Sequence, residues 1–138
     1  MERNTLYVWV HPDFAQVDAP EVNGWRRAIL GLRNTTSSGL VLVPWNFKKK
    51  PSFNDLNSLY SLAQSTLGNR FFSWTRGQFI CPGDMSKLPR ELLSNKQTAR
   101  CYGLQPSFCV QDQTDYLINS RHFNQVINEG YYPYQSFQ

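Results

Sequence analysis

The sequence predicts a small α/β domain in which strands and helices alternate through the first half of the chain. Three short apolar runs, at residues 6–10, 40–43 and 71–74, have the length and composition of strands. The two segments between these runs carry apolar residues at helical spacing. Right-handed crossovers in a β-α-β-α-β order would make the three strands parallel and give a three-layer sheet domain.

The first strand is expected to end at a proline turn. Residues 6–10 are rich in β-branched and aromatic side chains, which favour a strand. Pro12 pushes His11 away from helical backbone angles. The strand should therefore finish near His11.

The next helix and strand follow from the pattern after Pro20, a residue type that is common in the first turn of a helix. Apolar residues then recur at spacings of three and four, at Val22, Trp25, Ile29 and Leu32. Residues 34–39 supply a loop. The continuous apolar run 40–43 is typical of a strand that is covered on both faces.

The second helix has the clearest signals in the chain. Ser52 and Asp55 resemble a capping box at its start, and Gly68 stops it. Its apolar stripe consists of Phe53, Leu56, Leu59, Tyr60, Ala63 and Leu67. Residues 70–74 then form the third strand.

The second half of the chain is less regular. Pro82, Gly83 and Asp84 indicate a turn, and residues 89–95 a short helix. Further strands are expected at residues 98–104, 107–110 and 115–119. Ser120 would cap a last helix that carries Phe123, Val126 and Ile127 and ends at Gly130. For this part of the sheet the sequence allows antiparallel strands as well as parallel ones.

Composition bounds the class of protein. A length of 138 residues, with 41% hydrophobic and 17% charged residues, fits one globular domain over residues 1–138. The formal charge of +4 favours acidic partners. No segment resembles a secretory leader or reaches the roughly 20 apolar residues that span a bilayer, so we expect a cytoplasmic protein without a membrane partner. The three cysteines lack C-x-x-C spacing, which argues for reduced, mostly buried thiols.

The candidate site lies where the predicted parallel strands end. Each apolar run is followed directly by aromatic and polar residues, and open α/β sheets bind their ligands at the carboxyl ends of their strands. Our first hypothesis is a domain that binds a small anionic or aromatic ligand there. In this hypothesis the rings of Trp45 and Trp74 form the walls of the site, and Arg76 and His11 make polar contacts to the ligand. The carboxylate of Asp13 would orient the His11 imidazole.

A second hypothesis is a metal-dependent hydrolase or phosphodiesterase. His11 and Asp13 could hold a metal ion or exchange protons. With the proline between them they resemble the His-Pro-Asp start of the zinc-dependent sugar deacetylases, and that resemblance implies a bound zinc ion. Phe14 replaces that family's second Asp and no His-x-x-His pair follows, so an acidic ligand would come from elsewhere, with Asp84 or Asp112 as candidates. With two histidines in the chain, a histidine-rich metal site is excluded.

A third hypothesis is a nucleic-acid or protein interaction module. Lys48, Lys49 and Lys50 follow two aromatic residues, and rings beside positive charge suit stacked bases and phosphates. A tail rich in tyrosine, at residues 131–134, would also take part in the interaction. The sequence contains neither of the glycine-rich phosphate-binding motifs, G-x-G-x-x-G and G-x-x-x-x-G-K-S/T. It also lacks the G-x-S-x-G motif of serine hydrolases. The sequence therefore assigns no cofactor and leaves open whether the protein is an enzyme.

Overall fold

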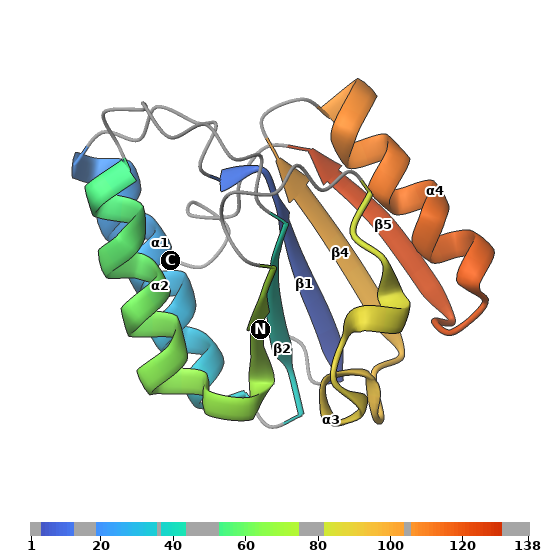
Figure 1. Cartoon of the computed structure of the whole chain (residues 1–138), viewed down its shortest axis with the longest axis horizontal. Helices are drawn as coiled ribbons and strands as arrows, with labels where there is room; N and C mark the ends of the chain where they lie inside the picture. Colours follow the sequence, from blue (N-terminus) through green and yellow to red (C-terminus); the bar gives the residue numbers. More distant parts are fainter. Residues whose placement is uncertain are drawn as a thin grey trace.

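The computed structural model describes residues 4–12, 19–35, 37–43, 53–74, 82–103 and 106–130, with the side chains of residues 19–23, 53–57 and 106 left out. Strands and helices alternate along this part of the chain (Figure 1). The elements are β1 (Thr5–Val10), α1 (Ala19–Arg33), β2 (Gly39–Val43), α2 (Phe53–Leu67), β3 (Phe71–Ser73), α3 (Arg90–Leu93), β4 (Thr98–Gly103), α4 (Gln111–Ser120) and β5 (Gln125–Gly130). A π-helical turn, Pro106–Val110, leads into α4.

The strands form one sheet in the order β3-β2-β1-β4-β5, and every described pair is parallel. The predicted α/β class and the three adjacent parallel strands of the first half are confirmed. The prediction that left room for antiparallel strands in the second half is wrong. A helical connection precedes both β4 and β5. Such a crossover returns the chain to the edge at which the previous strand began, so the next strand runs parallel to it.

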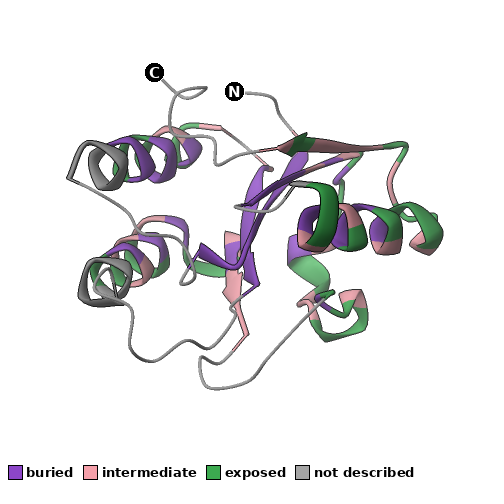
Figure 2. Cartoon of the chain, turned by 90° about the horizontal axis from the view of Figure 1, so that it is seen from above, coloured by how far each residue is buried: buried purple, intermediate pink, exposed green. Residues whose placement is uncertain are grey.

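Helices cover both faces of the sheet. In Figure 1, α1 and α2 lie on one side of the strands and α3 and α4 on the other. The strand β1 serves both faces by alternation: Tyr7 and Trp9 belong to the core under α1 and α2, whereas Val8 and Val10 belong to the core under α4. Figure 2 shows the buried residues gathered in the central strands and on the inner sides of the helices.

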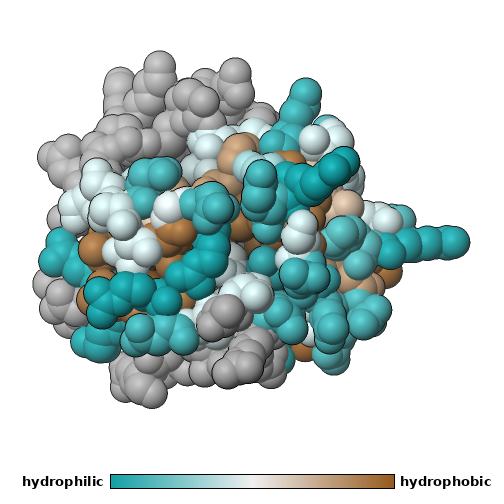
Figure 3. Space-filling view, turned by 90° about the horizontal axis from the view of Figure 1, so that it is seen from below, coloured by the Kyte–Doolittle hydropathy of each residue, from teal (hydrophilic) through white to brown (hydrophobic). Residues whose placement is uncertain are grey.

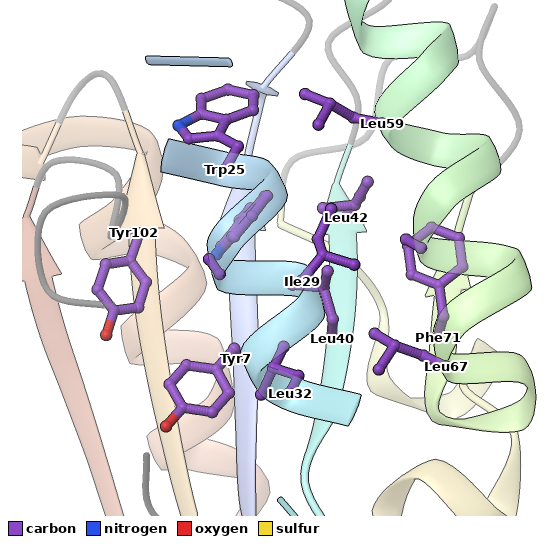
Figure 4. Close-up of a cluster of buried hydrophobic side chains, with 13 residues drawn as sticks. Tyr7, Trp25, Ile29, Leu32, Leu40, Leu42, Leu59, Leu67, Phe71 and Tyr102 are labelled. Atoms are coloured by element: carbon purple, nitrogen blue, oxygen red, sulfur yellow. The ribbon is translucent and has the colours of Figure 1, made fainter. Parts of the chain in front are cut away.

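The core under α1 and α2 confirms the two predicted helical stripes where they are described. Trp25, Ile29 and Leu32 from α1 and Leu59 from α2 are buried against β2 (Figure 4). The centroids of the Trp9 and Trp25 rings are 5.3 Å apart, with the planes tilted by 49°. The predicted cap at Ser52 lies outside the described residues.

Two strand predictions in the second half are wrong, because residues 107–110 belong to the π-helical turn and residues 115–119 to α4. The buried positions here are Val110, Gln113, Thr114 and Leu117, which recur at helical spacing. Two of these four side chains are polar, so the apolar pattern alone hides the stripe.

The helix predicted after Ser120 is also wrong, because this segment is the edge strand β5. Arg121 adopts a left-handed conformation with φ of 58° and ends α4. Val126 is half-buried and packs on the α4 side, and the other residues of the strand are likewise exposed or half-buried. An edge strand that is half exposed has a weak apolar pattern. The β-branched residues Val126 and Ile127 were the remaining sequence signal for a strand here.

Candidate functional site

All described strands end at one edge of the sheet, which is the edge viewed in Figure 2. The connections that leave β1 and β4 at this edge lead in opposite directions along the sheet. From β1 the chain proceeds through α1 to β2, and from β4 it proceeds through α4 on the opposite face to β5. The register sets Val10 beside both Val43 and Gly103. The boundary between β1 and β4 is therefore the topological switch point of the sheet.

His11 is the first residue beyond β1, and its backbone is left-handed with φ of 55°. Histidine is among the residue types that adopt this region more readily than most. Its N–H donates to the Val43 carbonyl oxygen at 2.6 Å, so pairing with β2 continues past the strand. The residue is 4% exposed. The backbone thus fixes His11 at the switch point.

Trp74 follows β3 directly and is half-buried. Its ring meets Phe72 edge-on, with centroids 4.9 Å apart. A Cβ atom placed on Gly83 would lie 2.7 Å from Cη2 of Trp74 and 3.2 Å from Cγ2 of Val43. The tip of the indole therefore packs where only a glycine leaves room, which holds the ring in place and leaves part of it accessible.

Gln113 of α4 holds Gly83 under the Trp74 ring. The Gly83 N–H donates to Oε1 of Gln113, and Nε2 of Gln113 donates to the Gly83 carbonyl oxygen at 3.2 Å. Both residues are buried. One amide side chain thereby satisfies both backbone groups of a buried turn, and it links α4 to the ring at the end of β3.

Asp84 and Tyr116 form a second link between the same turn and α4. The Tyr116 hydroxyl donates to Oδ1 of Asp84 at 2.8 Å and accepts from the Met85 N–H at 3.1 Å. The hydrogen bond from Tyr116, followed by those from Ser86, lowers the pKa of the Asp84 carboxyl below its usual value. Burial first, and the bond to Asp84 second, raise the pKa of Tyr116. The carboxylate of Asp84 thus anchors this turn.

The other side of the switch point is closely packed. A Cβ atom on Gly103 would lie 2.5 Å from Cγ2 of Val110 and 3.0 Å from the carbonyl oxygen of Val10. The chain leaves β4 here and enters the helical segment 106–120, whose amino end carries a partial positive charge. Asp112 is the acidic residue in the first turn of α4.

Two of the five predicted site residues are described, and both lie at the carboxyl edge. Val43 connects them, because it accepts the His11 N–H and its side chain lies beside Gly83 under Trp74. The other three, Asp13, Trp45 and Arg76, lie outside the described residues and stay predictions, as do the roles of Lys48, Lys49, Lys50 and the tyrosine-rich tail.

Sequence reasoning missed Gln113 and Tyr116. Gln113 occupies a helical position between Val110 and Leu117, three residues after the first and four before the second. That spacing was the available signal for both the helix and the buried amide. Their hydrogen bonds to residues 83–85 join positions about 30 apart in the chain, which no local pattern encodes.

The described residues contain no group of three His, Cys, Asp or Glu side chains that could hold a metal ion. Cys101 is buried and Cys109 half-buried, and neither forms a disulfide within the described part of the chain. Burial raises the pKa of the Cys101 thiol to about 12, an effect that a hydrogen bond with Thr114 partly opposes. A thiol with so high a pKa is a poor nucleophile.

No family model, curated protein or solved structure matched the chain in the three comparisons made with known proteins. None of the described helices is long and apolar enough to cross a membrane.

Proposed function

We propose that this protein binds a small anionic or aromatic ligand at the carboxyl edge of its sheet, beside the switch point between β1 and β4. The observation that carries the proposal is the strand order β3-β2-β1-β4-β5 with all pairs parallel. In open α/β sheets, ligands bind outside the carboxyl ends of the strands where the strand order reverses.

The chemistry of this edge supports a ligand that is anionic, aromatic or both. Trp74 presents a half-buried ring that is held by Phe72 and Gly83, and such a ring offers a flat apolar wall at little entropic cost. The segment 106–120 directs its amino end toward the end of β4, and anions are favoured at helix amino ends. His11 would contribute a polar contact, with Asp13, Trp45 and Arg76 completing the site.

Tryptophan emission tests this proposal. A panel of nucleoside monophosphates and aromatic carboxylates would be titrated against the protein, and we expect at least one saturable response. Trp45→Phe and Trp74→Phe assign the response to a ring at the edge, because Trp9 and Trp25 are 1% exposed in the core. Arg76→Ala should weaken binding by about 10- to 100-fold if the guanidinium donates to an anionic group.

The matched control is Arg27→Ala, which removes an exposed arginine on α1. It should leave the affinity unchanged. Equal losses in both variants would show that only the net charge acts, and a panel without any saturable response would overturn the proposal. A response that requires added Zn²⁺ or Mn²⁺ would instead favour the metal-dependent hydrolase.

A further inference from the structure

A groove of about 490 Å³ lies between the segment 85–94 and the second half of α4. It is lined by described residues of α3, α4 and their flanking turns. Because α4 runs away from the carboxyl edge and ends before β5 begins, the groove lies toward the opposite, amino edge. Figure 3 views the molecule from that edge, where hydrophobic side chains show between hydrophilic ones. Its volume lies within the usual range of small-molecule sites.

The floor of the groove is apolar. Met85, Leu88 and Leu93 are half-buried and pack against the core under α4. Tyr116 adds an aromatic ring whose hydroxyl is already bonded to Asp84 and to the Met85 N–H. The groove therefore presents mainly carbon atoms to a ligand, and burying an apolar body there would be favourable.

The rim of the groove carries a cationic side chain, that of Arg90. His122 lines the rim beside it, and no carboxylate does. Within the described part of the chain, the Arg90 guanidinium makes no ion pair. Nε2 of His122 lies 3.0 Å from the Leu93 carbonyl oxygen, an acceptor, so this nitrogen carries the proton and Nδ1 is the nitrogen left for a ligand.

We propose that this groove binds a small amphipathic anion, such as a medium-chain carboxylate. The apolar chain would lie on Met85, Leu88 and Leu93, and the carboxylate would accept hydrogen bonds from Arg90 and, when His122 is protonated, from its Nδ1–H. Asp84 precedes Met85 but does not line the groove, and its carboxylate accepts from Tyr116 and Ser86. This site is separate from the one at the carboxyl edge and does not depend on it.

The methyl group of Met85 reports on the groove directly. The chain has two methionines, Met1 and Met85, so a spectrum of ¹³C-methyl methionine contains two signals to follow. Octanoate would be titrated beside octanol and octylammonium, which share its chain and differ in charge. We expect the Met85 signal to shift saturably with octanoate. Octanol should bind with an affinity at least tenfold lower, and octylammonium should not shift the signal.

Two variants connect the shift to the rim charge. Arg90→Gln should weaken octanoate binding by about tenfold or more, whereas Arg27→Gln, an exposed arginine on α1, should leave it unchanged. Circular dichroism would confirm that both variants fold. Equal affinity for octanol and octanoate, equal losses in the two variants, or a stationary Met85 signal would each overturn the proposal. The edge site is tested separately by tryptophan emission, so failure of one proposal leaves the other standing.

Discussion

Gln113→Leu should destabilise the protein through two backbone groups that the substitution leaves without partners. Gln113 is 2% exposed and bonds both the N–H and the carbonyl oxygen of the buried Gly83. Leucine has a similar volume but can neither donate nor accept. Each buried group left unsatisfied costs about 1–3 kcal/mol, so the two groups together cost about 2–6 kcal/mol, and the buried leucine returns roughly 1.5–3 kcal/mol. At the midpoints of these ranges the net loss should be about 2 kcal/mol.

Urea unfolding followed by circular dichroism measures this loss, with an unchanged m value as the sign that both end states are preserved. The control is Gln64→Leu, which changes an exposed glutamine in α2 and should shift stability by no more than about 0.5 kcal/mol. A Gln113→Leu loss below about 0.5 kcal/mol would refute the assigned role of the amide.

Gln113→Glu separates the two hydrogen bonds. The carboxylate still accepts from the Gly83 N–H but has no proton for the Gly83 carbonyl oxygen. Burial disfavours the charged form and raises the pKa of this glutamate in the folded state. The folded protein therefore binds the additional proton first, and the deficit of this variant should shrink as the pH falls from 7 toward 4. A deficit that is independent of pH would contradict this account.

Three further predictions follow from the packing and titration of buried residues. Leu59→Ala should cost about 2–5 kcal/mol in urea unfolding, because Leu59 is 3% exposed in the core. Gly103→Ala should cost about 1–3 kcal/mol, since its Cβ meets Val110 and the Val10 carbonyl, and Val110→Ala should recover part of that cost in the double variant. The folded Cys101 thiol keeps its proton to a pH of about 12 while the unfolded thiol ionises near 9.0, so stability should fall as pH rises above about 9, less steeply in Cys101→Ala.

The first half of the fold was predictable because its signals are local and mutually consistent. Apolar residues fill the strands β1 and β2, and the stripes of α1 and α2 consist of apolar residues at helical spacing. With right-handed crossovers, these elements allow little choice of topology. The positions of β4 and β5 in the sheet were not predictable in this way. They depend on β4 pairing with the side of β1 that β2 leaves open, after the connection formed by residues 82–97.

The prediction of the second half of the fold failed where polar residues occupy buried positions. Gln113 and Thr114 face the core in α4, and Thr114 donates to the Val110 carbonyl oxygen at 2.7 Å. Such residues interrupt an apolar stripe, and the hydrogen bonds that make their burial favourable exist only in the folded protein. Of the candidate site, the strand-end location could be inferred from sequence, whereas the packing of Trp74 on Gly83 required the structure.

The link from Trp74 through Gly83 to Gln113 joins the stability of the fold to the proposed site. Gln113 belongs to α4 and is buried, yet it fixes the glycine on which the edge ring packs. A preorganised ring loses little freedom when a ligand binds, so loosening Gly83 should weaken binding without removing any ligand contact. Gln113→Leu should therefore change the emission of Trp74 and lower ligand affinity together, whereas Leu59→Ala should lower stability and leave affinity intact while the protein remains folded. If both variants change affinity alike at matched stability, Trp74 is not positioned through this link.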